Sequence, residues 1–100
     1  MIYITQLIYI HPGREDTFDA FEDVAIPLIG KYNGELLLRL RPSPGAFIAP
    51  SAEHPYEVHL VSFESDADFE AFKTDKERER FLHLKEAAIR KVLLIKGIAL

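Results

Sequence analysis

The stretch that decides the fold is the opening one, residues 2–13, which reads Ile-Tyr-Ile-Thr-Gln-Leu-Ile-Tyr-Ile-His-Pro-Gly. β-branched and aromatic residues dominate it, which is typical of a β-strand, and the closing His-Pro-Gly predicts a turn. Apolar side chains fall on both faces of this strand, with Ile2, Ile4, Ile8 and Ile10 on one face and Tyr3, Leu7 and Tyr9 on the other. A strand that is covered on both faces usually lies in the middle of its sheet.

A helix is predicted after this turn, over residues 14–32. Its apolar side chains recur at steps of three and four residues, with acidic side chains between them, which is the pattern of a helix with one buried face. They are Phe18, Phe21, Ala25, Leu28, Ile29 and Tyr32. Pro27 cannot continue a regular helix, so we expect a kink or a separate last turn there. Asn33 and Gly34 are typical of a helix C-terminus and predict its end.

Two segments with alternating side chains follow, residues 35–41 and 56–63, and this period of two predicts strands. The first places Leu36, Leu38 and Leu40 on one face and Glu35, Leu37, Arg39 and Arg41 on the other. The second places Tyr56, Val58 and Leu60 on one face and Glu57, His59 and Val61 on the other. We expect an antiparallel pair joined by a long loop. Phe47 and Ile48 in that loop need cover, from a partner subunit, a pocket mouth or their own subunit.

The second helical region begins at Ser65, which with Asp68 forms a capping-box pattern. Phe69 and Phe72 begin its apolar stripe, and a second capping signal at residues 74–77 predicts a break followed by another short helix. Residues 73–80 carry charges of alternating sign, which indicates a solvated surface. The final apolar run, residues 92–95, predicts a short last strand.

The resulting order is β-α-β-β-α-β in an α+β protein. Two right-handed crossovers would fold it into a four-stranded antiparallel sheet with two helices on one face, the ferredoxin-like arrangement. We expect residues 1–100 to form a single ferredoxin-like domain.

The face of the sheet opposite the helices predicts a partner. We expect the first and last strands to form the central pair, and both are apolar on both faces, so the open face would expose a large apolar patch. A homodimer through this open sheet face would cover it. The alternative is that the long loop folds back over the face.

The sequence resembles the dimeric α+β barrel superfamily, in which two ferredoxin-like protomers pack their sheets together. The resemblance is carried by His11-Pro12-Gly13 after the first strand, by residues 26–35 at the helix end, by Phe63-Glu64-Ser65, and by residues 92–97. It looks most like the short bacterial families of unknown function in that superfamily, and more distantly like the NIPSNAP-like and antibiotic-biosynthesis monooxygenase-like proteins. The resemblance implies a fold and a dimer, but it does not choose an activity.

Composition excludes several classes of function. The chain has no cysteine, which excludes disulfides, thiolate nucleophiles and cysteine-ligated metals. Its net charge of −4 argues against a nucleic-acid partner, which needs a basic face. We expect no signal peptide and no membrane partner, because the N-terminus lacks a basic region and the apolar runs are shorter than the ~20 residues of a membrane span. A cytoplasmic location is expected.

The strongest candidate site lies on the two alternating strands. Arg39, Glu57 and His59 are the candidate catalytic residues, since pairing of the strands would bring them together. An arginine at such a site binds an organic anion, and a histidine acts as acid or base near neutral pH. The alternative is a structural arginine–glutamate pair with a histidine that fills space in the dimer interface.

Further candidates for ligand contacts are Arg41, Gln6, Tyr3 and Phe47. Gln6 needs hydrogen-bond partners if it is buried, and the sequence leaves open which face of the first strand meets the helices. The spacing of the four histidines does not match a metal-binding pair, so no metal is expected. No cofactor is expected either, and the alternative is a haem, which needs only one histidine, His59 or His83.

Three hypotheses of function therefore remain. The first is binding or transformation of a small organic molecule, anionic or aromatic, in a pocket lined by the second and third strands. The second is a non-catalytic assembly or ligand-sensing module. The third, which rests on the resemblance alone, is a cofactor-free monooxygenase-like enzyme.

Overall fold

The chain alternates strands and helices in the predicted order. A computed structural model describes residues 1–48 and 53–100. Its strands are β1 (Ile2–Ile10), β2 (Gly34–Leu40), β3 (Glu57–Phe63) and β4 (Ile89–Gly97). Its α-helices are α1 (Glu15–Leu28), α2 (Asp66–Lys73), α3 (Lys76–Arg80) and α4 (Leu82–Ala88), with 3-10 turns η1 (Ile29–Tyr32) and η2 (Pro44–Ala46). Part of the predicted long loop, residues 49–52, lies outside the described residues.

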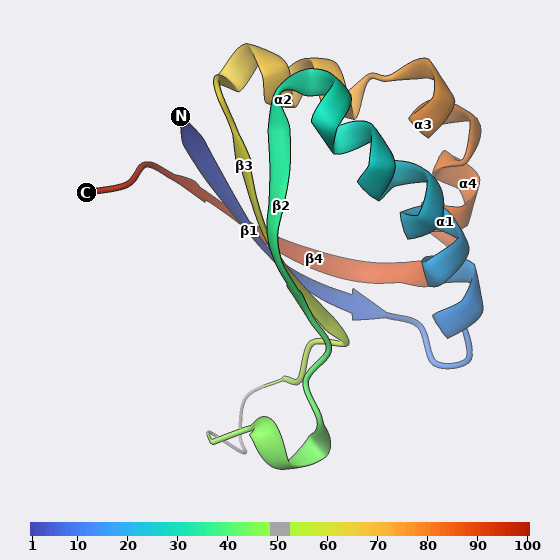
Figure 1. Cartoon of the computed structure of the whole chain (residues 1–100). Helices are drawn as coiled ribbons and strands as arrows, with labels where there is room; N and C mark the ends of the chain where they lie inside the picture. Colours follow the sequence, from blue (N-terminus) through green and yellow to red (C-terminus); the bar gives the residue numbers. More distant parts are fainter. Residues whose placement is uncertain (49–52) are drawn as a thin grey trace.

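The strands form one antiparallel sheet in the order β2-β3-β1-β4, and the helices cover one of its faces (Figure 1). This is the ferredoxin-like α+β arrangement, and that prediction is confirmed. The expectation that the first and last strands would form the central pair is wrong, because β3 is the central partner of β1 and β4 lies at an edge. Each crossover skips one strand position, so the two βαβ units interlock and enclose β1 and β3.

Helix α1 ends where its sequence predicts. Pro27 lies just before the last residue of α1, and the chain continues as the 3-10 turn η1, the separate last turn that was expected. Asn33 then takes the left-handed conformation, with φ 57°, and stops the helix. The chain enters β2 at Gly34, where the side chains of Phe63 and Ile29 occupy the space that a Cβ atom would need.

The second helical region is capped at Ser65 and broken at Asp75 as predicted, but it is broken once more at Phe81, between α3 and α4. The Ser65 hydroxyl accepts a hydrogen bond from the Asp68 amide at 3.2 Å, which begins α2. The second cap is Asp75, which accepts from the Arg78 amide at 2.9 Å and begins α3. The buried Asp75 carboxylate also accepts hydrogen bonds from Tyr32 and Lys31. These hydrogen bonds connect the break between α2 and α3 to η1, at the end of the first helical region.

Strand β2 does not keep a strict alternation. Its pairing with β3 shifts by one residue between Leu36 and Leu38, a β-bulge that leaves Leu37 as the extra residue. Leu36 therefore packs into the core on the helix side, and Arg39 pairs opposite His59 on that same side. The predicted grouping of Leu36 with the two later leucines of the strand is wrong, because the bulge turns those leucines to the open face.

The apolar core lies between the helices and the sheet. Its main cluster joins strands β1 and β3 to η1 and α2 and consists of Ile2, Ile4, Ile29, Val61, Phe63, Phe69 and Phe72. A smaller cluster at the other end of β1 joins α1 and α4 through Ile8, Phe18 and Ala88. The first strand therefore presents its isoleucines to the helices, which settles the orientation that the sequence left open.

Gly34 is expected to tolerate no side chain. A Cβ atom there would lie 2.6 Å from Cε1 of Phe63 and 2.7 Å from Cγ2 of Ile29, so Gly34→Ala should lower the free energy of unfolding by roughly 1–3 kcal/mol. Urea denaturation followed by circular dichroism measures this loss. Gly30→Ala is the control, because no atom lies within 4 Å of its Cβ position. An equal loss in both variants would contradict the prediction.

Candidate functional site

The centre of the site is Glu57, a carboxylate on β3 that is only 1% exposed. Nε of Arg39 donates to it at 2.9 Å and Nη2 of Arg41 donates to it at 2.6 Å. A ring nitrogen of His59, Nε2, is hydrogen-bonded to Oε2 of Glu57, the oxygen that also accepts from Arg39. Asp19 of α1 accepts from Arg41 at 3.0 Å, so the network links two strands and a helix.

The pKa of Glu57 reflects this pairing. Burial by itself raises the pKa of the carboxyl, but the hydrogen bonds from His59, Arg39 and Arg41 outweigh it and lower the pKa to about 2. Glu57 is therefore ionised over the whole range in which proteins ordinarily work. A carboxylate held by charged donors on two sides also fixes the ring of His59 in one orientation.

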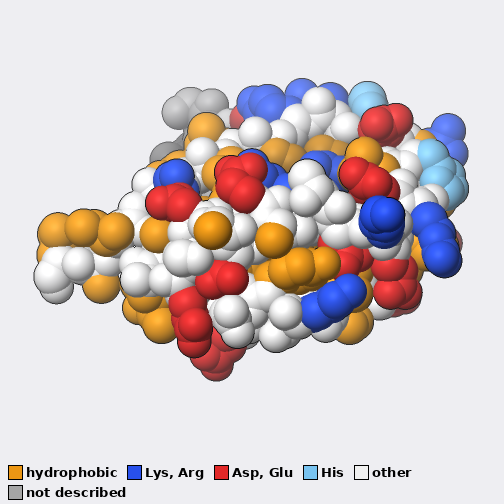
Figure 2. Space-filling view, turned by 90° about the horizontal axis from the view of Figure 1, so that it is seen from above, with side chains coloured by type: hydrophobic (Ala, Val, Ile, Leu, Met, Phe, Trp, Pro, Cys, Tyr) orange, Lys and Arg blue, Asp and Glu red, His pale blue; other side chains and the backbone are white. Residues whose placement is uncertain are grey.

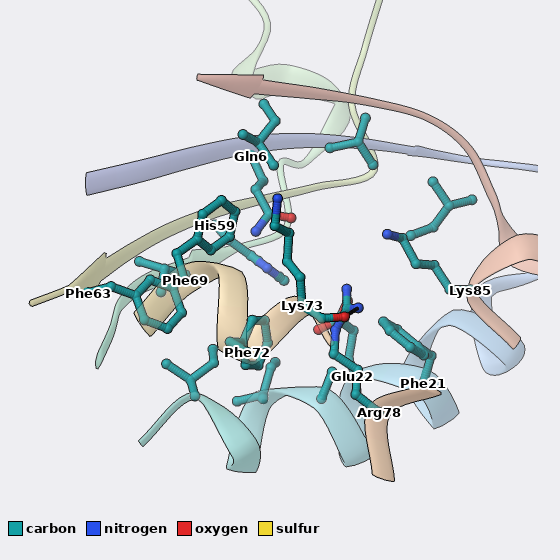
Figure 3. Close-up of a pocket in the computed structure, with 17 residues that line it drawn as sticks. Gln6, Phe21, Glu22, His59, Phe63, Phe69, Phe72, Lys73, Arg78 and Lys85 are labelled. Atoms are coloured by element: carbon teal, nitrogen blue, oxygen red, sulfur yellow. Dashed lines mark hydrogen bonds between the residues drawn. The ribbon is translucent and has the colours of Figure 1, made fainter. Parts of the chain in front are cut away.

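His59 connects this network to a cavity between the helices and the sheet. The cavity has a volume of about 160 Å³, and His59 is itself only 3% exposed. Its apolar lining includes Phe21, Phe63, Phe69, Phe72 and Val92, and its polar lining consists of Gln6, Glu22, His59, Lys73, Arg78 and Lys85. Figure 3 shows the side chains of His59, Glu22, Arg78 and Lys85 directed toward one space, from the sheet on one side and from the helices on the other.

The polar groups on the helix side of the cavity are strongly desolvated. Burial raises the pKa of Glu22, against the opposing effect of nearby His59. Burial also lowers the pKa of Lys85, and the neighbouring Arg78 lowers it further. A polar group with a shifted pKa inside a cavity is a candidate for chemistry or for ligand contact.

The structure brings together four of the residues predicted for the site. Arg39, Arg41, Glu57 and His59 form one hydrogen-bonded network. Gln6 lies on the helix side of β1 and lines the same cavity as His59.

Two other predicted ligand-binding residues lie elsewhere. Tyr3 is on the opposite face of the sheet, in a shallow cleft with Thr5, Leu60 and Ile95. Phe47 follows η2, where its ring stacks on His54 with centroids 3.5 Å apart. Neither residue is among those that line the cavity with His59.

Four polar residues of the cavity were not predicted from the sequence, namely Glu22, Lys73, Arg78 and Lys85. Glu22 falls four residues after Phe18 and three before Ala25, so an acid on the apolar stripe was a signal that could have found it. The prediction that residues 73–80 form only a solvated surface is wrong for Arg78, which is half-buried and lines the cavity. The short helix α3 turns that arginine inward, and nothing in the alternating charges indicates it.

The open face of the sheet carries exposed apolar side chains. They come from the two edge strands, as Leu38 and Leu40 on β2 and Leu93 and Ile95 on β4. Across the helical side, by contrast, acidic and basic side chains intermix, and apolar atoms stand out at the end where the C-terminal residues project (Figure 2).

Two further findings concern membranes and metals. Among the described residues, no helix has the length and apolar character needed to cross a membrane. Nor do residues 1–48 and 53–100 contain a group of three or more histidine or acidic side chains placed to hold a metal ion.

Solved structures with the same fold are numerous. A protein of unknown function from Rhodopseudomonas palustris superposes with a TM-score of 0.83 at 19% identity, over 99% of this chain and 82% of that one. An uncharacterised NIPSNAP domain protein from Burkholderia xenovorans gives 0.73 at 11% identity, over 100% and 95% of the two chains. A dimeric ferredoxin-like protein of unknown function from Jannaschia sp. CCS1 gives 0.71 at 16% identity, over 98% of each chain.

These similarities confirm the expected resemblance at the level of the fold. No protein-family model and no curated protein sequence matches the chain. The class that the structure defines is a ferredoxin-like α+β protein with a cavity between its helices and its sheet.

Removal of the Glu57 charge is expected to destabilise the protein. Glu57→Gln leaves Arg39 and Arg41 without their buried partner, which should cost roughly 3 kcal/mol. Because folding lowers the pKa of Glu57 from 4.5 to about 2, its contribution is fully present above pH 4.5 and is lost as the pH falls toward 2. Urea denaturation at a series of pH values measures both effects.

The exposed Glu64 provides the matched control for this change. Glu64→Gln should leave both the stability and its dependence on pH almost unchanged. If Glu57→Gln kept the full acid-side dependence of the wild type, the carboxylate would not be the group that titrates.

Proposed function

We propose that this chain binds a small organic molecule in the cavity between its helices and its sheet, and that His59 exchanges a proton with that molecule. The observation that carries the proposal is the double role of His59. One ring nitrogen is held by the buried Glu57 carboxylate, and the ring also lines the cavity. A histidine oriented in this way serves as a general acid or base near neutral pH.

The size and lining of the cavity support a ligand of one ring. An apolar cavity of about 150 Å³ holds a benzene molecule, and this cavity measures about 160 Å³. Phe21, Phe63 and Phe72 supply apolar contact, while Gln6 and His59 supply hydrogen bonds. Ligand sites in proteins commonly combine a mostly apolar wall with a few placed polar groups.

A non-catalytic ligand-sensing module is the second candidate, and it is favoured by the complete pairing of Glu57. A carboxylate that holds two arginines and a histidine stabilises the sheet without any chemistry. In that case the ligand would contact the cavity wall but not the ring of His59. The cofactor-free monooxygenase-like activity and the cytoplasmic location stay predictions from the sequence.

We further propose a homodimer through the open sheet face. Leu93 is 48% exposed and Ile95 is 52% exposed, and with the leucines of β2 they lie on a face that the chain's own helices do not cover. Exposed apolar faces of this kind usually meet a second copy. The similar protein from Jannaschia sp. CCS1 is described as dimeric.

Phenol is expected to bind in the cavity, because it matches one ring with one hydrogen-bonding group. A titration followed by two-dimensional NMR should give saturable shifts at the cavity-lining residues, and a proton-exchanging His59 should shift its ring resonances as well. Ala25→Leu fills part of the cavity and should abolish these shifts, with Val92→Phe as a second filling variant.

The matched control for the filling variant is Ala20→Leu, since Ala20 is on the same helix but exposed. The binding proposal fails if phenol causes no saturable shift at the cavity or binds equally to Ala25→Leu. Saturable binding that leaves the His59 ring unchanged would support the sensing module instead.

Ile95→Lys is expected to convert a dimer into a monomer, because it buries a charge in the proposed apolar interface. Analytical ultracentrifugation of wild type and variant measures the change in mass. Leu94→Lys is the control, since Leu94 has similar exposure on the same strand but faces the helices. A monomeric wild type, or equal dissociation by both variants, would rule out this interface.

A further inference from the structure

Three cations lie on the helix side of the cavity, and two of them form no ion pair within the described residues. The sequence suggested that Arg39 and Arg41 would bind an anion, but both pair with Glu57, and both also lie within 4 Å of Asp19. The cations that line the cavity are instead Lys73, Arg78 and Lys85, one from each of the helices α2, α3 and α4. Of these, Lys73 pairs with Glu70 at 3.0 Å.

The guanidinium of Arg78 is held in place but is not fully hydrogen-bonded. It lies over the rings of Phe72 and Phe21, at 5.2 Å and 5.5 Å from their centroids. One of its terminal nitrogens, Nη1, donates to the backbone oxygen of Lys73 at 3.1 Å. Its Nε atom is buried and has no hydrogen-bond partner among the described residues. A buried donor without an acceptor is costly and calls for one.

Lys85 is a second cation at the same wall of the cavity as Arg78. Its side chain is half-buried at the cavity wall, and within the described part of the chain it forms no ion pair. Burial lowers its pKa, and so does the nearby Arg78, as expected for two cations that share a poorly solvated site. A single anion bound between Arg78 and Lys85 would offset the unfavourable burial of both cations.

Glu22 forms no ion pair with either of these two cations. It is buried and lines the cavity, but no oxygen of Glu22 lies within 4 Å of Arg78 or Lys85 in the ion pairs of the described residues. Burial raises the pKa of Glu22. The helix side of the cavity therefore offers two cations, Arg78 and Lys85, that form no ion pair within the described residues.

We propose that the cavity takes a small monocarboxylate, whose carboxylate accepts hydrogen bonds from Arg78 and Lys85 while its apolar body lies against the phenylalanines. The inference rests on the proposed binding function and names its ligand class. A carboxylate suits this position because charge-assisted bonds from an arginine and a lysine are strong. A phosphate, with up to two charges, would need more donors than this largely apolar wall presents.

Benzoate and its neutral isostere benzamide test this inference on the wild-type protein. Isothermal titration with each, beside phenol as the probe for the cavity itself, should show benzoate binding about tenfold or more tightly than benzamide. Arg78→Met keeps the side chain over the phenylalanine rings but removes the donors, and should weaken benzoate by about tenfold while phenol changes little. Lys85→Met should also weaken the binding of benzoate. This variant serves as the test if Arg78→Met does not fold.

Arg80→Met is the matched control, because Arg80 is on the same short helix but exposed. The carboxylate inference is overturned if phenol binds in the cavity and benzoate binds no better than benzamide, and the binding function then stands. If neither phenol nor benzoate binds, the binding function fails as well. Equal weakening of benzoate by Arg80→Met would indicate attachment to surface charge and would overturn the inference.

Discussion

A single buried carboxylate, that of Glu57, is the constraint on which the rest of this site depends. A charge so far from solvent persists only with charged partners, and here they are Arg39 on β2 and Arg41 just after it. His59 on β3 adds a further hydrogen bond. The bulge in β2 at Leu37 lets Arg39 reach Glu57, because in a strand without a bulge Arg39, three residues after Leu36, would face the opposite side from Leu36. Asp19 extends the same network to α1, so one ion cluster sets the register of two strands against a helix.

This arrangement separates the charges of the molecule into two groups. Arg39 and Arg41 are neutralised at the side of the sheet, and His59 is the network's one member that lines the cavity. The positive charge of the cavity comes from the helix layer instead, through Arg78 and Lys85. The opposite face of the sheet carries exposed apolar side chains from β2 and β4. One face of the sheet thus lines the cavity, and the other carries exposed apolar side chains.

Local signals in the sequence predicted the helix boundaries well. The stop at Asn33 and the cap at Ser65 depend on residues within one turn of each other, and the structure contains both. The clustering of Arg39, Glu57 and His59 was also predictable, since pairing of neighbouring strands brings their alternate residues together. The position of Glu22 in the cavity was predictable, because an acid on an apolar helix face stands out in the sequence. The position of Arg78 was not, because the burial of Arg78 depends on how the three short helices α2, α3 and α4 pack.

The sequence by itself determined the element order and the ferredoxin-like class, because periodicity, caps and turn residues act over a few neighbouring positions. It also determined that Glu57 and His59 share a face of their strand. Only the tertiary structure decided that β3 rather than β4 lies beside β1 at the centre, that β2 is bulged, and that Arg78 and Lys85 meet His59 around one cavity. These features depend on contacts between residues far apart in the chain, and such contacts are decided by packing and strand register rather than by local preference.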